Sequence, residues 1–289
     1  MIKPSELIIN PDGSIFHLHL KPEQLADYVI LVGDPGRVEL IGQLLSDVEF
    51  QVQNREFVST TGKYNGKRVT IVSTGIGTDN IDIVVNELDA LANINLTTRE
   101  INPTLRKLNF VRIGTSGGLQ DDLPVNSFVI SQKAIGFDGL LNFYARRNEV
   151  SDLPFEEAFR KHTGWGAQLT SPYVVDCSEI LLKKIHRDDT VTGVTISAPG
   201  FYGPQGRVLR LPLADPDLNA KIESFLYQGH RITNFEMECS AIYGLSKLMG
   251  HEALTVCLII ANRVNKNANV SYHDAMETLI RLVLHRLTS

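Results

Sequence analysis

Short apolar runs recur along the chain, and most end in a small or polar residue. They are rich in Val and Ile, a composition typical of strands, and several are continuous enough to be buried on both faces of a sheet. We therefore predict strands at residues 28–32, 69–73, 110–113, 127–131, 190–197 and 254–261.

Helical spacing fills some of the intervals between these strands. Residues 79–92 place apolar side chains at the i, i+3, i+4, i+7 positions of an amphipathic helix, and Asp79 is expected to cap its N-terminus. Residues 236–249 carry a similar stripe, and Gly250 fits the position that stops a helix. Apolar residues between Met276 and Leu287 predict a last helix.

The alternation of strands and helices predicts an α/β fold. Asn65-Gly66 directly before a strand is typical of a hairpin, so part of the sheet is expected to be antiparallel. No repeat or linker divides the chain, and we expect a single domain over residues 1–289, with a central mixed β-sheet flanked by helices. Residues 93–109 are irregular and interrupted by Pro103; we expect an insertion there, either an exposed excursion or a short extra helix.

Composition excludes several classes of protein. The formal net charge is −5, without a basic stretch, which argues against general nucleic-acid binding. The three cysteines (Cys177, Cys239 and Cys257) are scattered, and no Cys/His metal motif occurs, so we expect neither disulfides nor a metal. No apolar stretch reaches the roughly 18 residues of a membrane helix, and the first residues lack a signal-peptide run. We therefore expect a cytoplasmic protein that binds no membrane.

Glycine-rich segments follow three of the predicted strands, at residues 33–37, 75–77 and 114–118. Each alone is often only a tight turn, but glycine also lets an anion approach the backbone. Arg37 lies in the first of these turns and Arg112 in the strand that leads into the third, while Arg55 lies apart from them, in residues 54–57. An arginine in a buried strand, as Arg112 is expected to be, needs an anionic partner, and its planar fork matches phosphate oxygens. We predict a phosphate pocket; an internal salt bridge of Arg112 is the alternative.

The segment from Gly114 to Gly118 also matches the Gly-x-Ser-x-Gly pattern of a serine hydrolase nucleophile, with Ser116 at its centre. That motif requires a helix directly after the turn. Residues 119–125 lead instead toward another strand, so a serine hydrolase is the weaker interpretation.

The second half of the chain carries groups suited to a base and a sugar. Gln205 offers a hydrogen-bond donor and an acceptor and Arg207 offers donors, so together they could read the edge of a heterocycle on which Phe201 packs. The alternative is an ordinary surface turn. Residues 260–263 end the most apolar strand with a cation, Arg263, or are a plain strand end.

Two glutamates open the predicted helix at residue 236. Glu236 and Glu238 are spaced i, i+2, so we expect one to face a site and the other to face solvent or a partner. A carboxylate at this position could accept hydrogen bonds from a sugar diol, with Met237 packed on the sugar. The alternative is that acidic residues simply favour a helix N-terminus.

These motifs, in this order, resemble those of the uridine phosphorylases, in the nucleoside phosphorylase family, from about His17 to Arg263. The matching segments are residues 16–18, 33–37, 54–57, 73–77, 112–115, 201–207, 236–238 and 262–263. The resemblance implies one α/β domain that converts uridine and phosphate into uracil and ribose 1-phosphate, without a cofactor.

The resemblance also implies roles for individual residues. Phosphate would be bound by Gly33, Arg37, Arg112 and Thr115, with Arg55 reaching in from a neighbouring subunit. Ribose would contact Thr115, Met237 and Glu238, with His17 from across the same interface. The base would meet Phe201, Gln205 and Arg207, with Arg263 near a carbonyl group. The catalytic residues would be Arg112, Arg207 and Glu238. Glu56 would line an intersubunit site for a monovalent cation, in a homodimer or a hexamer of dimers.

The chain departs from the family pattern in the loop expected to bind the base. Residues 198–200 replace polar residues, Gly203-Pro204 inverts a Pro-Gly order, and Gly206 stands where an acid is common. Purine-specific relatives carry an acid near the last matching segment, whereas residues 255–271 contain none. Alternatives to uridine phosphorolysis are a phosphorylase of purine nucleosides or thymidine, a nucleoside hydrolase of the same fold, and a nucleoside-binding protein without turnover.

Overall fold

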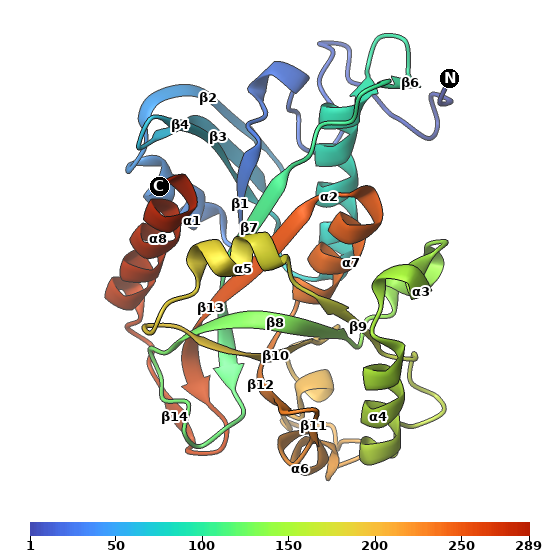
Figure 1. The fold of residues 1–289 in the computed structure, drawn as a ribbon, viewed down its shortest axis with the longest axis vertical. Helices are drawn as coiled ribbons and strands as arrows, with labels where there is room; N and C mark the ends of the chain where they lie inside the picture. Colours follow the sequence, from blue (N-terminus) through green and yellow to red (C-terminus); the bar gives the residue numbers. More distant parts are fainter.

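The computed structural model describes all residues from Met1 to Ser289 (Figure 1). The α-helices are α1 (Pro35–Gly42), α2 (Thr78–Asn93), α3 (Arg147–Val150), α4 (Leu153–Thr163), α5 (Glu179–Ile185), α6 (Leu218–Glu223), α7 (Cys239–Met249) and α8 (His273–Thr288). Short 3₁₀ helices are η1 (Pro22–Gln24), η2 (Leu140–Phe143) and η3 (Gly203–Gln205). The strands are β1 (Tyr28–Val32), β2 (Ser46–Asn54), β3 (Phe57–Tyr64), β4 (Lys67–Ser73), β5 (Ile94–Asn95), β6 (Glu100–Ile101), β7 (Asn109–Gly118), β8 (Phe128–Gly136), β9 (Tyr173–Asp176), β10 (Val191–Ser197), β11 (Leu226–Tyr227), β12 (His230–Glu236), β13 (Glu252–Asn262) and β14 (Asn267–Ala268).

The central sheet is mixed, as predicted. Its strand order is β11-β12-β10-β8-β13-β7-β1-β4-β3-β2, and β12 also pairs with β7. That extra pairing closes β7, β12, β10, β8 and β13 into a ring. Strands β4, β1, β7 and β13 run parallel, whereas β2, β3 and β4 form an antiparallel meander.

The six predicted strands are present, although several are longer than the apolar runs that indicated them. Strand β8 continues to Gly136 and β7 to Gly118, because the strands on either side keep pairing beyond the apolar part. The predicted hairpin joins β3 to β4, where Asn65 and Gly66 have φ angles of 50° and 74°. Positive φ at both positions is what a two-residue hairpin turn requires.

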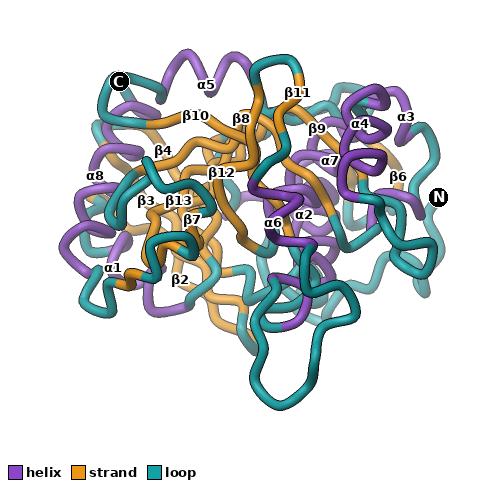
Figure 2. Tube along the Cα trace, turned by 90° about the horizontal axis from the view of Figure 1, so that it is seen from below, coloured by secondary structure: helices purple, strands orange, loops and turns teal.

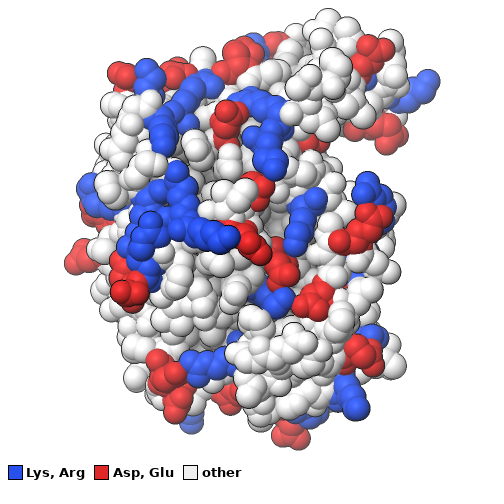
Figure 3. All heavy atoms as spheres, in the orientation of Figure 1, with Lys and Arg blue, Asp and Glu red and all other residues white.

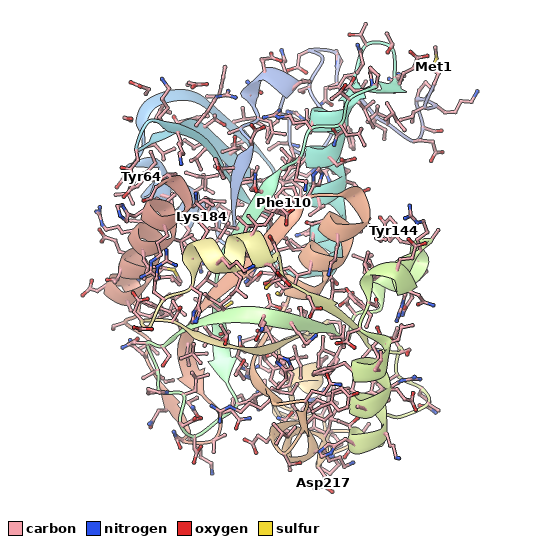
Figure 4. The ribbon with its side chains drawn as sticks, in the orientation of Figure 1. Met1, Tyr64, Phe110, Tyr144, Lys184 and Asp217 are labelled. Atoms are coloured by element: carbon pink, nitrogen blue, oxygen red, sulfur yellow. The ribbon has the colours of Figure 1, made fainter.

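Helices cover both faces of the sheet. In Figures 1 and 2, α1 and α8 lie on one side of the strands and α2 and α7 on the other. The principal core joins apolar side chains of β1, β4, β7 and β13 to both groups of helices. Phe110 of β7 lies inside this core, whereas Tyr64 and Lys184 lie at the periphery (Figure 4). The fold is therefore a single α/β domain of the predicted class.

Two predicted helix starts are wrong. Helix α2 begins at Thr78, and its N-cap is Gly77, whose φ of 100° suits glycine; Asp79 lies in the first turn. Its carboxylate there still interacts favourably with the helix dipole. Helix α7 begins at Cys239 instead of at Glu236, because Glu236 is still paired with β10 as the last residue of β12. Gly250 ends α7 in the left-handed conformation, as predicted.

Residues 93–109 form an exposed excursion with the two-stranded ladder β5–β6, so the alternative of a short extra helix is wrong. The Ile2 N–H donates to the Arg99 carbonyl at 2.8 Å, which fixes the N-terminal segment beside β6 (Figure 1). That this excursion is an insertion stays a prediction.

The surface mixes charges of both signs. On the face drawn in Figure 3, Lys and Arg are interspersed with Asp and Glu. None of the helices is both long and apolar enough to cross a membrane.

Candidate functional site

A cavity of about 720 Å³ lies where β1, β7 and β13 run into their connecting loops and the N-termini of α1, α2 and α7. Loops at strand ends are the usual place for ligands in α/β sheets. The cavity is lined by ten of the residues to which the sequence assigned a role, namely Gly33, Arg37, Glu56, Arg112, Thr115, Phe201, Gln205, Arg207, Met237 and Glu238. A second pocket, of about 530 Å³, lies between α1 and β2–β3 and contains none of them.

Arg37 is placed by the turn between β1 and α1. The Asp34 carboxylate accepts a hydrogen bond from the Gly36 N–H at 2.9 Å and caps the helix, which sets Arg37 in its first turn. Burial, and next the nearby Arg112 guanidinium, lower the pKa of Arg37. The two positive charges repel one another, and an anion bound beside both would relieve that repulsion.

Arg112 lies in the middle of β7 and is buried. Its guanidinium pairs with the Glu238 carboxylate, and Nη1 lies 3.2 Å from Oε2 of Glu236. Burial opposes the charge, but the two carboxylates outweigh it, and the pKa of Arg112 is raised. The internal salt bridge considered as an alternative is therefore present, while Arg112 also lines the cavity.

Both glutamates are buried and face Arg112, so the prediction that one of them faces solvent or a partner is wrong. The reason is local: Glu236 ends a strand and Glu238 caps the following helix, so the i, i+2 rule for a helix does not apply. The Glu236 carboxylate accepts hydrogen bonds from the Glu238 N–H at 2.8 Å and the Ser197 hydroxyl at 2.5 Å. Glu236 therefore organises the turn that presents Glu238.

Glu238 connects this turn to the start of α2, where Oε1 accepts the Gly77 N–H at 2.7 Å. Burial raises the pKa of Glu238 to about 7; the Glu236 carboxylate acts in the same direction, and Arg112 acts against both. One cation thus serves two buried carboxylates, which makes the second of them harder to ionise.

The loop around η3 holds the aromatic, amide and guanidinium groups predicted to read a base. The Arg207 guanidinium carbon lies 3.7 Å from the centre of the Phe201 ring, and Nη1 donates to the Gln205 side-chain oxygen at 2.5 Å. This contact leaves the Gln205 amide nitrogen as a free donor. Burial, followed by the neighbouring Arg263, lowers the pKa of Arg207 to about 10.

Arg263 is not among the residues that line the cavity. Its guanidinium donates to the backbone carbonyls of Gln205, at 2.7 Å, and Gly206, at 3.2 Å. The structure therefore brings Arg263 to the back of the loop that carries the other predicted base-binding residues.

Arg55 and His17 also lie outside the cavity of their own chain. Arg55 is exposed in the tight turn between β2 and β3, with φ 54°. The neighbouring Asn54 side chain donates to the His17 carbonyl at 2.8 Å, so both residues lie on the same part of the surface. Their assignment to a neighbouring subunit stays a prediction.

Ser116 does not occupy a nucleophile elbow. Strand β7 continues through it to Gly118, no helix follows, and its buried hydroxyl has no hydrogen-bond partner. The geometry that a serine hydrolase needs is therefore absent. No group of three or more His, Cys, Asp or Glu side chains is placed to hold a metal ion.

Sequence reasoning missed two features of the cavity. Asn80 lines it, close enough to Gly75 that a Cβ there would lie 2.4 Å from the Asn80 amide nitrogen. The role of Glu236 as a partner of Arg112 was also missed, although an arginine expected in a buried strand signals that a carboxylate must be near.

Comparison with known proteins gives a consistent picture. Residues 27–287 match the family model described as "Phosphorylase superfamily". A uridine phosphorylase of Thermococcus kodakarensis is 30% identical over 261 residues, which cover 88% of this chain and 79% of the relative. A DeoD-type purine nucleoside phosphorylase of Listeria welshimeri is 26% identical, over 93% of this chain and 95% of the relative. The crystal structure of a Trypanosoma brucei nucleoside phosphorylase, described as showing uridine phosphorylase activity, superimposes with a TM-score of 0.88 and 30% identity, covering 97% of this chain and 99% of that one.

Proposed function

The chain belongs to the phosphorylase superfamily, and from this premise we propose that it is a nucleoside phosphorylase that converts uridine and inorganic phosphate into uracil and ribose 1-phosphate. The proposal includes the identity of the base, which membership of the family does not specify. The relatives described above include both uridine and purine nucleoside phosphorylases.

One observation carries the proposal. A single cavity holds a pair of neighbouring arginines, Arg37 and Arg112, together with the Phe201, Gln205 and Arg207 group. The two arginines suit a dianion. The aromatic, amide and guanidinium groups suit a flat heterocycle with carbonyl and N–H groups on its edge. A reaction in which phosphate displaces the base of a nucleoside needs both in one cavity.

The chemistry requires no nucleophile from the protein. A phosphate oxygen attacks C1′ as the bond from C1′ to the base breaks, the electron pair leaves with the base, and the sugar passes through an oxocarbenium-like state. Catalysis then consists of positioning and electrostatic stabilisation. Arg37 and Arg112, with Gly33 and Thr115, hold phosphate against the developing sugar cation. Arg207 and Gln205 stabilise the negative charge that develops on the uracil carbonyl groups.

The turn between β12 and α7 binds the sugar. Glu238 accepts hydrogen bonds from the ribose hydroxyls, and Met237 packs on the ring. Arg55 and His17 serve the site of a neighbouring subunit, so the active form is a homodimer or a hexamer of dimers, and Glu56 lines a cation site at that interface. Arg55 is exposed and His17 is partly buried, and both lie outside the cavity of their own chain, which supports this assignment.

Uracil release from uridine, with and without inorganic phosphate, tests the reaction directly. We expect release that depends on phosphate and is matched by ribose 1-phosphate. Equal release in phosphate-free buffer would indicate a hydrolase of the same fold. Binding without any product would indicate a nucleoside-binding protein.

A purine nucleoside phosphorylase is the second candidate, supported by the similarity to the Listeria enzyme. Against it, residues 255–271 contain no acid that could contact a purine. Uridine, inosine and thymidine assayed side by side decide between them. Faster cleavage of inosine or thymidine would overturn the uracil assignment and leave the phosphate site in place.

A further inference from the structure

Two side chains from different parts of the chain hold the backbone of the loop that carries Gln205 and Arg207. Arg263, just beyond β13, donates from both terminal nitrogens, to the Gln205 carbonyl at 2.7 Å and the Gly206 carbonyl at 3.2 Å. Asn219, in α6, donates its amide N–H to the same Gln205 carbonyl at 3.2 Å. The carbonyl of the residue expected to read the base therefore accepts two hydrogen bonds from outside the loop.

The hydrogen bonds within the loop run only between residues 201 and 207, so they fix its local shape but not its place beside the cavity. Its only regular element is η3, a single turn of three residues, and an isolated turn of this length has little stability. Gly206 follows with φ 71°, and this left-handed residue turns Arg207 back so that its N–H donates to the Tyr202 carbonyl at 2.8 Å. Beyond Arg207, residues 208–211 are exposed and form no backbone hydrogen bonds.

Asn219 packs directly over this turn. A Cβ at Gly206 would lie 2.2 Å from the Asn219 amide nitrogen, so the two residues fit together only because position 206 is glycine. A side chain at position 206 would displace Asn219 from the Gln205 carbonyl.

Arg263 is oriented for the same task. It is absent from the cavity lining, and both terminal nitrogens of its guanidinium donate to the back of the loop. Arg207, in contrast, lines the cavity and lies on the Phe201 ring. The two arginines are neighbours, but only Arg207 is placed to meet a ligand.

We propose that Arg263 and Asn219 are positioning residues, which act on the base only through the backbone of Gln205 and Gly206 and do not touch it. This inference replaces the role expected for Arg263 from the family resemblance, a contact near a base carbonyl. It rests on the proposed function for the identity of the base. The hold that Arg263 and Asn219 have on the loop backbone, called the clamp below, does not depend on that function.

Hydrogen exchange tests the clamp without any substrate. We expect the amides of Gln205, Gly206 and Arg207 to exchange at least tenfold faster in Arg263→Met and in Asn219→Ala than in the parent protein. Arg210→Met is the matched control, since Arg210 is exposed in the same loop and its side chain makes no hydrogen bond in this structure; it should leave these amides unchanged. Unchanged exchange in both clamp variants would overturn the proposal.

Kinetics separate a clamp from a direct contact. Both clamp variants should raise the KM for uridine roughly tenfold and leave the KM for phosphate within twofold. Inhibition by uracil and by 2-hydroxypyrimidine, which lacks the oxygen at C4, should weaken by the same factor. If Arg263→Met abolished the preference for uracil over 2-hydroxypyrimidine while Asn219→Ala kept it, Arg263 would touch the base and the proposal would be wrong.

Two further measurements keep the outcomes distinct. Arg263→Lys retains one donor for the Gln205 carbonyl. Its amide exchange rates should therefore lie between those of the parent and of Arg263→Met, and they remain informative even if Arg263→Met folds poorly. A parent protein that cleaves no uridine would refute the proposed substrate, and the exchange experiment would still decide the clamp.

Discussion

Gly114→Ala should disable the phosphate site without introducing any polar change. Gly114 lies two residues after Arg112 in β7, so both face the same side of the sheet. Its φ is not in the left-handed region, and the backbone therefore tolerates alanine. The nearest obstacle is the Arg112 side chain, which folds across the space that a Cβ would fill.

The structure sets the size of the effect. A Cβ at Gly114 would lie 2.0 Å from Nη1 of Arg112 and 2.8 Å from its Cζ. Ordinary contact begins near 3.4 Å, so the guanidinium must move by about 1.4 Å. A displacement of about 1 Å at a reacting centre is enough for a loss of roughly 10²-fold. Weakening one charge-assisted hydrogen bond to phosphate, at about 2 kcal/mol, corresponds to a loss of about 30-fold. We expect a loss between these two values.

The assay is the rate of uracil formation as a function of phosphate concentration at saturating uridine. Gly114→Ala should lower kcat/KM for phosphate by about 30- to 100-fold, and Gly114→Ser at least as much. The KM for uridine should change far less. Circular dichroism and the melting temperature establish that each variant is folded.

The same substitution in an Arg112→Ala background provides the control. With no guanidinium left to displace, Gly114→Ala should lower the residual activity no further. An unchanged phosphate dependence in the single variant would refute the reasoning. So would an equal loss in both backgrounds, which would locate the effect in the strand instead of in Arg112.

Three other predictions concern the assembly and the buried glutamates. Mixed and reassembled Arg55→Ala and Arg112→Ala subunits should regain activity that neither has alone, because a hybrid then contains one intact shared site; no recovery would place Arg55 in its own subunit or outside the site. Between pH 4.5 and about 7 the contribution of Glu238 to the free energy of unfolding should fall as pH rises, because folded Glu238 keeps a proton that the unfolded chain has already released. Glu238→Gln should flatten this part of the profile, and parallel melting curves of the two proteins from pH 5 to 8 would contradict the raised pKa. Ser197→Ala should lower the free energy of unfolding by roughly 1–3 kcal/mol, since the Ser240 N–H, which donates to the Ser197 hydroxyl at 2.8 Å, is left buried without an acceptor; urea denaturation measures this, and a loss under about 0.5 kcal/mol would show that the backbone finds another partner.

The sequence by itself determined the class of fold and ten of the 21 residues that line the cavity. Apolar runs locate strands because burial on both faces of a sheet requires continuous hydrophobicity, a property local to each run. The glycine-rich turns follow from the same pattern, and with them the position of Gly33 and Arg37 at the end of β1. The helix starts were less predictable, since Gly77 and Glu238 cap α2 and α7 through backbone conformations that composition does not reveal.

Only the tertiary structure decided how the charged groups are paired. Residues far apart in the chain meet at Arg112, where Glu236 and Glu238 arrive from the turn after β12. Spacing along the chain suggested that one glutamate faces outward, whereas both face Arg112, a residue of the distant strand β7, from the end of β12 and the N-cap of α7. Arg263 is the clearest case: its position at a strand end suggested a ligand contact, but its orientation, and so its partners, depend on where the loop after β10 folds back. Hydrophobic periodicity is a local property that the sequence states directly, whereas the partner of a charge is fixed by contacts between distant segments, which exist only once the chain has folded.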